Sequence, residues 1–181
     1  MSAHPVSSVI AETGCSVVFF LTRLRLVPGA VLSAQGNPKE GIIMCIVNAM
    51  SRYVLDNGVQ LSGCKALYNL ADQHQPNSIA IIQVGGLVRI SSAMHMFPAN
   101  NWLHTVACAI LRILSESSIC SQWPTQCNVS PVIGCILNAM PLYAADDSLQ
   151  VPMADFLCLS YALTQCLFML CIFHVQTLSS H

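Results

Sequence analysis

Charged side chains are scarce in this chain. Lysine and arginine together number 7 and aspartate and glutamate 8, so 8% of the 181 residues are charged, whereas typical soluble domains carry about 25%. The net charge of -1 provides no basic surface for the phosphates of DNA or RNA. We therefore expect no nucleic-acid partner, and the low charge favours an extensive apolar interface with protein or membrane.

The sequence also lacks the motifs of common enzymes. It has no glycine-rich phosphate loop, no His-Glu-x-x-His and no Gly-x-Ser-x-Gly. Asp146-Asp147 lies in a loop-like stretch, and we interpret it as a helix cap rather than an acid–base pair. The six histidines are scattered without metal-ligand spacing. We predict no catalysis, no cofactor and no metal site.

None of the ten cysteines belongs to a Cys-x-x-Cys pair, and Cys120 and Cys127 lack zinc-ligand spacing. Free cysteine behaves as a small apolar residue. Five cysteines lie inside apolar helical runs at core-like positions: Cys45, Cys64, Cys108, Cys135 and Cys158. We predict reduced, structural thiols and hence a reducing compartment, the cytoplasm or the nucleus. The first residues carry no basic cluster typical of a secretion signal, so the glycosylation sequon at Asn128 is not expected to be used.

One helical pattern occurs twice between residues 41 and 114, at a constant offset of 44. The ladder pairs Ile43 with Leu87, Ile46 with Ile90, Ala49 with Ala93, Met50 with Met94 and Tyr53 with Phe97. Further along, the offset pairs Gln60 with His104, Gly63-Cys64 with Ala107-Cys108, and Leu67 and Leu70 with Leu111 and Leu114. An offset of 46 extends the ladder to Ile133, Ile136, Ala139, Met140 and Tyr143. Helices recurring at this period are typical of a solenoid.

Breaks in the pattern divide the chain into units. Residues 1–12 are interpreted as a frayed start or a remnant helix, and residues 13–26 as a helix of an incomplete first unit. A turn is predicted at residues 55–58, with Asp56 or Asn57 as the N-cap of the next helix. A second turn is predicted at Gly85-Gly86, after a short helix over residues 77–84. The fourth unit is degenerate, with one helix over residues 131–143 and another from about Gln150.

Residues 77–90, Asn-Ser-Ile-Ala-Ile-Ile-Gln-Val-Gly-Gly-Leu-Val-Arg-Ile, followed by an apolar helix that contains Ala107–Leu114, resemble an armadillo repeat. Residues 60–71 are similar to the third helix of such a repeat. The resemblance extends over residues 13–165, with residues 166–181 as an apolar helix end and tail. It implies an all-α, right-handed superhelix of three to four repeats, whose third helices line a concave groove that binds a protein or peptide.

Armadillo proteins that bind nuclear localisation signals present a Trp and, four residues later, an Asn from each third helix. The equivalent pairs here are Ser16 and Phe20, Lys65 and Asn69, Ala109 and Ile113, and Asp155 and Leu159. Only Asn69 matches, so this ligand class is not expected. The groove predicted from the resemblance is lined by Phe20, Gln60, Lys65, Asn69, His104, Ile113 and Leu159.

Two features of that groove have alternatives. The apolar row of Phe20, Ile113 and Leu159 would suit an amphipathic helix, unless the register assigned to these helices is off by one residue or neighbouring segments cover these side chains. The polar row of Gln60, His104 and Gln150 either faces the groove or forms an ordinary solvated helix edge.

The stretch over residues 156–175 contains no formally charged residue and is long enough to span a bilayer. A tail-anchored membrane adaptor facing the cytosol is therefore the alternative function. Against it, the first half of the stretch coincides with the third helix of the fourth unit, and Ser160, Thr164 and Gln165 lower its hydrophobicity. A terminal repeat usually has a polar outer face, so docking onto further protein in a larger assembly is also open. Our prediction is a soluble, non-catalytic interaction scaffold.

Overall fold

The computed structural model describes residues 5–24, 41–72, 74–116 and 130–139. Within these ranges the chain forms seven helices and no strand: α1 (Pro5–Arg23), α3 (Ile42–Arg52), α4 (Asn57–Ala71), α5 (Gln75–Gln83), α6 (Gly86–Met96), α7 (Asn101–Ser115) and α9 (Ser130–Ala139). The predicted all-helical class is confirmed. The candidate anchor over residues 156–175, together with Leu159 and Gln150, lies outside the described residues.

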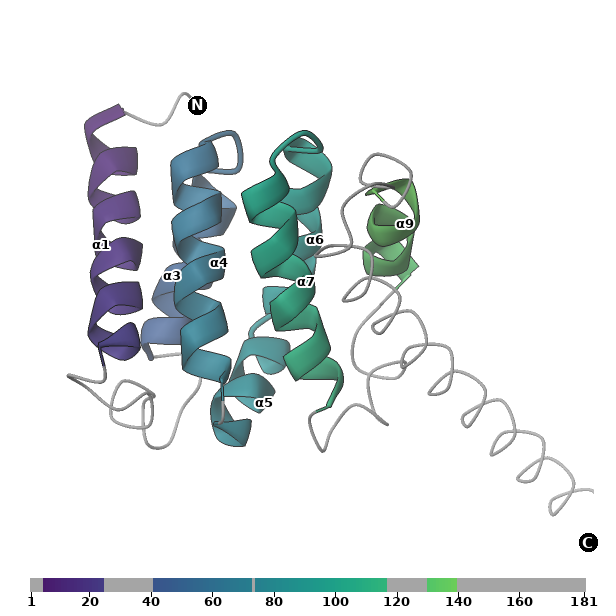
Figure 1. Cartoon of the computed structure of the whole chain (residues 1–181). Coiled ribbons are helices and arrows are strands. Elements are labelled where there is room, and N and C mark those ends of the chain that lie inside the picture. Colours follow the sequence, from purple (N-terminus) through teal and green to yellow (C-terminus); the bar gives the residue numbers. More distant parts are fainter. Residues whose placement is uncertain (1–4, 25–40, 73, 117–129, 140–181) are drawn as a thin grey trace, which may run out of the picture.

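The helices are arranged in two layers (Figure 1). In one layer α4 lies between α1 and α7 and packs against both. In the other layer α6 contacts α3 on one side and α9 on the other, while α3 also packs on α4 and α6 on α7. The short α5 contacts both α4 and α6. Helices related by the sequence offset of 44 are therefore neighbours within one layer.

Most of the apolar residues that match at this offset are buried alike, although Ala49 and Phe97 are only partly buried where their matches Ala93 and Tyr53 are buried. Met50 and Met94 have 0% and 1% of their surface exposed, and both belong to a single hydrophobic core. The other matched core pairs are Ile43 and Leu87, Ile46 and Ile90, Cys64 and Cys108, Leu67 and Leu111, and Leu70 and Leu114. The apolar ladder in the sequence thus identifies the inward sides of α3, α4, α6 and α7.

The helix starts at the turns are capped by side chains at matching positions. Asp56 Oδ1 accepts a hydrogen bond from the backbone N–H of Val59 at 3.1 Å, which confirms the predicted cap of α4. Asn100, 44 residues later, caps α7 in the same way through the N–H of Leu103, also at 3.1 Å. Such a cap stabilises a helix by about 1 kcal/mol because it satisfies a first-turn amide that has no partner within the helix.

The Gly85-Gly86 pair forms the predicted corner between α5 and α6. Gly85 has a φ of 80°, in the left-handed region that glycine adopts without steric cost. A Cβ added to Gly86 would lie 2.8 Å from the carbonyl oxygen of Ile81, so a side chain there would force the two helices apart. Both glycines are required by the tight approach of α6 to α5.

The structure differs from the sequence interpretation at the N-terminus. α1 is continuous from Pro5 to Arg23, so the predicted boundary between residues 12 and 13 falls inside a helix. Proline fits the first position of a helix, where its missing N–H needs no partner. Val9 and Ile10, before the predicted boundary, belong to the same helix as Val17 and Phe20 after it.

Candidate interaction surface

Gln60 was predicted to line the groove or a solvated edge, but it is buried, with 2% of its surface exposed. Its side-chain amide donates to the carbonyl oxygens of Met50 and Tyr53, both at 2.9 Å. These carbonyls belong to the last turn and end of α3, where no later residue of the helix can donate to them. Gln60 therefore ties the end of α3 to the start of α4, and the solvated-edge interpretation is wrong for this residue.

His104 occupies the equivalent place in the next unit. It is also 2% exposed, and its imidazole interacts with the backbone of Met94 and Phe97 at the end of α6. These residues match Met50 and Tyr53 at the offset of 44. Burial lowers the pKa of His104, and the two backbone interactions oppose that shift. His104 is therefore a buried structural residue, and the solvated-edge interpretation is wrong here as well.

Asn69, which matches the armadillo asparagine, contacts the neighbouring helix. Its side-chain amide donates to the carbonyl oxygen of Phe19 in α1 at 3.1 Å. Ile113, at the matching place in α7, is partly buried and packs against the core. The alternative of coverage by neighbouring segments thus holds for Ile113. Phe20 has the same place in α1, at the end of the layer, and is 55% exposed.

Lys65 and Arg23 meet at one aromatic ring between α1 and α4. The Lys65 ammonium lies 5.9 Å and the Arg23 guanidinium 5.7 Å from the centre of the Phe19 ring. A cation at this distance from an aromatic face is attracted by about 0.5–1 kcal/mol at exposed sites. The Phe20 ring meets Phe19 edge-on, with ring centres 5.2 Å apart. Two positive charges are therefore held beside two aromatic side chains.

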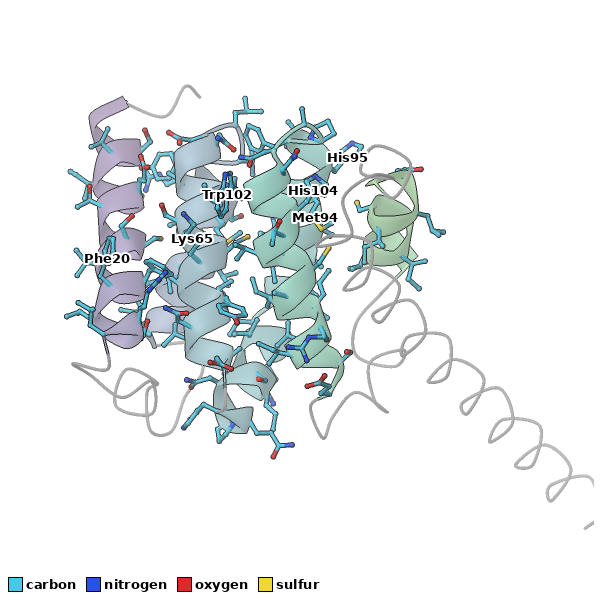
Figure 2. The ribbon with its side chains drawn as sticks, viewed as in Figure 1. Phe20, Lys65, Met94, His95, Trp102 and His104 are labelled. Atoms are coloured by element: carbon cyan, nitrogen blue, oxygen red, sulfur yellow. The ribbon has the colours of Figure 1, made fainter. Side chains whose placement is uncertain are left out.

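Trp102 was not among the predicted site residues. It lies in the first turn of α7 and is 73% exposed. Figure 2 shows Trp102 and Lys65 on the layer that contains α4 and α7. A hydrogen bond from the Asn100 side chain to that of Asn57, 2.6 Å long, joins the beginnings of α4 and α7. Tryptophan is enriched in protein-binding surfaces because it offers a large rigid contact area.

We define the α1–α4–α7 face as Phe19, Arg23, Lys65 and Trp102. Lys65 projects from α4 while Phe19 and Arg23 project from α1, and Trp102 comes from α7. On α7, helical spacing places Trp102 on the same side as the part-exposed Thr105, Ala109 and Arg112. Arg112 forms an ion pair with Glu116 at 2.8 Å, so its charge is already matched.

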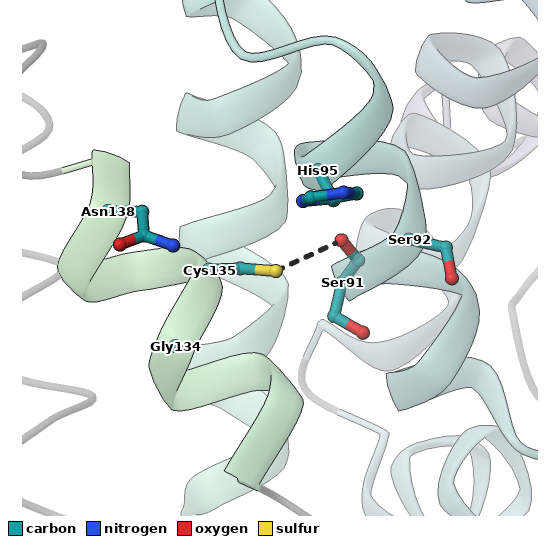
Figure 3. Close-up of a pocket in the computed structure, with 6 residues that line it drawn as sticks. All are labelled: Ser91, Ser92, His95, Gly134, Cys135 and Asn138. Atoms are coloured by element: carbon teal, nitrogen blue, oxygen red, sulfur yellow. Dashed lines mark hydrogen bonds between the residues drawn. The ribbon is translucent and has the colours of Figure 1, made fainter.

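A shallow cavity of about 370 Å³ lies between α6 and α9 (Figure 3). Its lining contains His95 and Cys135, a residue pair that serves in some nucleophilic enzymes. The Cys135 thiol, however, donates to the backbone carbonyl of Ser91 at 3.5 Å, and burial raises its pKa. A thiol held neutral in this way is a poor nucleophile.

The buried cysteines are equally unsuited to reaction. Burial raises the pKa of Cys15 to about 11, and of Cys64 and Cys108 to about 12. All five cysteines in the described residues are free thiols. Cys45 is an exception to the prediction, because it is exposed, at a hollow between α1 and α3. Within the described residues no three His, Cys, Asp or Glu side chains are placed to hold a metal ion.

Comparison of the chain with protein-family models, curated proteins and solved structures found no significant match in any of the three. The armadillo resemblance therefore rests on the sequence pattern alone. Among the described helices none is individually long and apolar enough to cross a membrane. Only α5 and α6 together satisfy length and composition, and they are bent by 74° at their junction.

Proposed function

We propose that this protein is a non-catalytic scaffold, an armadillo-like solenoid that binds a peptide segment of a partner protein on the α1–α4–α7 face. The observation that carries the proposal is the pair of cations at Phe19, contributed by two different helices. Helices stacked with shared burial at equivalent positions support a rigid surface, and a preformed surface lowers the entropic cost of binding.

The partner's chemistry follows from that surface. Within the described residues, Lys65 and Arg23 form no ion pair with a carboxylate, while Phe19, Phe20 and Trp102 supply aromatic area. A peptide with an acidic side chain flanked by apolar residues would pair with the cations and cover the rings. The proposed compartment is the cytoplasm or nucleus, which the free thiols support.

Peptide selection against the full-length chain tests this proposal. From a library displayed on phage, we expect enriched sequences that combine an acidic residue with aromatic or aliphatic neighbours. Lys65→Glu should weaken binding of a selected peptide by about 10-fold or more, since it replaces an attraction by a repulsion. Trp102→Ala should weaken it similarly.

The matched control is Arg89→Glu. Arg89 is a partly exposed cation on α6, in the other layer, so its reversal changes the net charge equally without touching the proposed surface. Fluorescence anisotropy with a labelled peptide gives each affinity. Equal loss in Lys65→Glu and Arg89→Glu would mean that overall charge, and not this surface, determines binding. Selection of no peptide at all would contradict the proposal.

A further inference from the structure

The two cations at Phe19 lie close to a pair of serine hydroxyls that joins α1 to α4. The Ser16 hydroxyl donates to the Ser62 hydroxyl at 3.2 Å. Ser62 comes three residues before Lys65, and Ser16 comes three residues before Phe19, so on each helix the serine shares a side with the later residue. The Ser62 oxygen accepts the bond from Ser16, which leaves its own hydroxyl hydrogen able to point to a ligand. We define the Phe19 cluster as the polar side chains around this ring, which are Ser16, Arg23, Ser62 and Lys65.

The positive charge of the Phe19 cluster is not matched within the part of the chain that the structure describes. Glu12 lies seven residues before Phe19, and Asp72 lies seven residues after Lys65. Among the described residues neither carboxylate forms an ion pair with Lys65 or Arg23. Lys65 is partly exposed and Arg23 is exposed, so a ligand can reach both side chains. The cluster therefore offers both charges to an anion.

A phosphate monoester matches this cluster better than a carboxylate does. A carboxylate has two oxygens and a single negative charge, whereas a phosphate monoester carries a charge of about -1.5 to -2 at neutral pH on three oxygens. An arginine guanidinium binds such a group through two parallel hydrogen bonds, and a lysine ammonium binds it as a point charge. The Ser62 hydroxyl supplies a further donor of the kind that phosphate oxygens accept from. Two charges and a hydroxyl, contributed by two helices, therefore suit a tetrahedral dianion.

The cluster suits a single phosphate group on a peptide rather than a polymer or a membrane surface. Nucleic acids and anionic membranes are bound by many lysine and arginine side chains, whereas this whole chain has 7 and a net charge of -1. Phe20, whose ring meets Phe19 edge-on, is 55% exposed, and Trp102 is 73% exposed. These rings can cover apolar peptide residues beside the phosphate. A phosphorylated peptide would therefore use the charges and the aromatic area together.

We propose that the partner residue bound at the Phe19 cluster is phosphorylated, so that phosphorylation of the partner promotes its binding. This inference rests on the peptide-binding function proposed for the α1–α4–α7 face. Arg23 and Lys65 pair with the phosphate oxygens, and Ser62 donates a further hydrogen bond to them. The Phe19 ring already attracts both cations, at 5.7 and 5.9 Å from its centre. Holding two long side chains at the site before the ligand arrives lowers the entropic cost of binding.

Peptide libraries with a fixed central residue test this on the full-length chain. The libraries share random flanking residues and carry phosphoserine, phosphotyrosine, glutamate or serine at the centre. The phosphorylated libraries should retain the most protein. A retained sequence is then made in its phosphorylated, glutamate and unphosphorylated forms, and fluorescence anisotropy gives each affinity. The phosphorylated form should bind about 10-fold more tightly than the glutamate form, because it carries the additional charge and oxygen.

Variants and pH assign the phosphate to the Phe19 cluster. Lys65→Gln and Arg23→Gln remove one charge each and keep a long polar side chain, and each should weaken binding of the phosphorylated form by about 10-fold. Ser62→Ala should weaken it by about 2- to 5-fold. Arg89→Gln, on α6 in the other layer, is the matched control and should leave the affinity unchanged. Binding of the phosphorylated form should weaken between pH 7.5 and 5, because a phosphate monoester takes up a proton near pH 6, while binding of the glutamate form stays nearly constant.

Failure of this proposal and failure of the peptide-binding function give different results. Equal affinities for the phosphorylated and glutamate forms would overturn phosphate recognition and leave the peptide-binding function standing, whereas retention by no library would contradict both. Phosphopeptide binding that is unchanged in a folded Lys65→Gln, Arg23→Gln double variant, as judged by its melting curve, would overturn the assignment. So would displacement of the phosphopeptide by inorganic phosphate or by phosphatidylcholine–phosphatidylserine vesicles at the phosphate concentration at which unlabelled phosphopeptide displaces it.

Discussion

Gln60 and His104 are buried donors at matching positions. Exchanging them, through Gln60→His and His104→Gln, should move a pH dependence of stability from the unit that contains His104 to the unit that contains Gln60. Each side chain interacts with the end of the helix before its own, which is α3 for Gln60 and α6 for His104. Only the imidazole titrates near neutral pH. Burial lowers the pKa of His104 in the folded protein, whereas the unfolded chain has the ordinary value near 6.5. As the pH falls below about 6.5, the unfolded state therefore takes up a proton before the folded state does.

The sign and size of the effect follow from this difference. The contribution of uncharged His104 to stability is fully present above the pKa that this histidine has in the unfolded chain. It is lost as the pH falls from that value toward the lower pKa of His104 in the folded protein. Over that interval the free energy of unfolding decreases by about 1.4 kcal/mol per pH unit for one proton. For a chain of this length each kcal/mol corresponds to a melting temperature shift of about 2–4 °C.

The assay is urea unfolding followed by circular dichroism at several pH values between 5 and 7.5, a range chosen around the histidine pKa. His104→Gln copies the arrangement at Gln60, so it should match wild type at pH 7.5 and exceed it at pH 5. Gln60→His should add a second fall in stability over the same interval. Since all other titrating groups are shared, differences between curves isolate the two positions. Parallel curves for wild type and His104→Gln would refute the reasoning.

Three further outcomes are expected from particular contacts. A Cβ at Gly63 would lie 2.7 Å from Cγ of the fully buried Met50, so Gly63→Ala should destabilise the fold by about 1–3 kcal/mol in urea unfolding. A smaller loss when the same change is made in a Met50→Ala background would identify the clash. Asp56→Ala removes the cap of α4 and should cost about 1 kcal/mol; an unchanged midpoint would mean that the cap contributes nothing. Brief alkylation of the native protein, mapped by mass spectrometry, should modify Cys45 well before Cys64, because Cys45 is exposed and burial raises the pKa of Cys64 to about 12; equal labelling would contradict the burial.

The core was predictable from the sequence because apolar residues buried on one side of a helix recur at a regular spacing. The turns were predictable as well. Met50 and Met94 recur at the same place in two matching patterns, and both are buried. Gly85-Gly86 marked a corner because glycine punctuates helices, and the positive φ of Gly85 gives the reason. Cys45 was placed wrongly because an apolar run does not by itself show which of its residues face outward.

The candidate surface was less predictable because the sequence does not show which groups a polar side chain will bond to in the folded protein. Gln60 and His104 appeared to be surface residues, and only the chain reversal between α3 and α4, or α6 and α7, brings them to helix-end carbonyls. Trp102 was overlooked because its match at the offset of 44 is Gly58, so the repeat gave it no emphasis. The cations at Phe19 come from two helices that the repeat pattern could not orient relative to each other.

One position shows how the packing of the layer creates its own exposed end. Asn69 in α4 bonds to the backbone of α1, and Ile113 at the matching place in α7 is partly buried against the core. Phe20 is the corresponding residue in α1, where no further helix of the described chain precedes it. The position that contacts neighbouring residues in the middle of the layer therefore presents an exposed apolar side chain at the end of the layer.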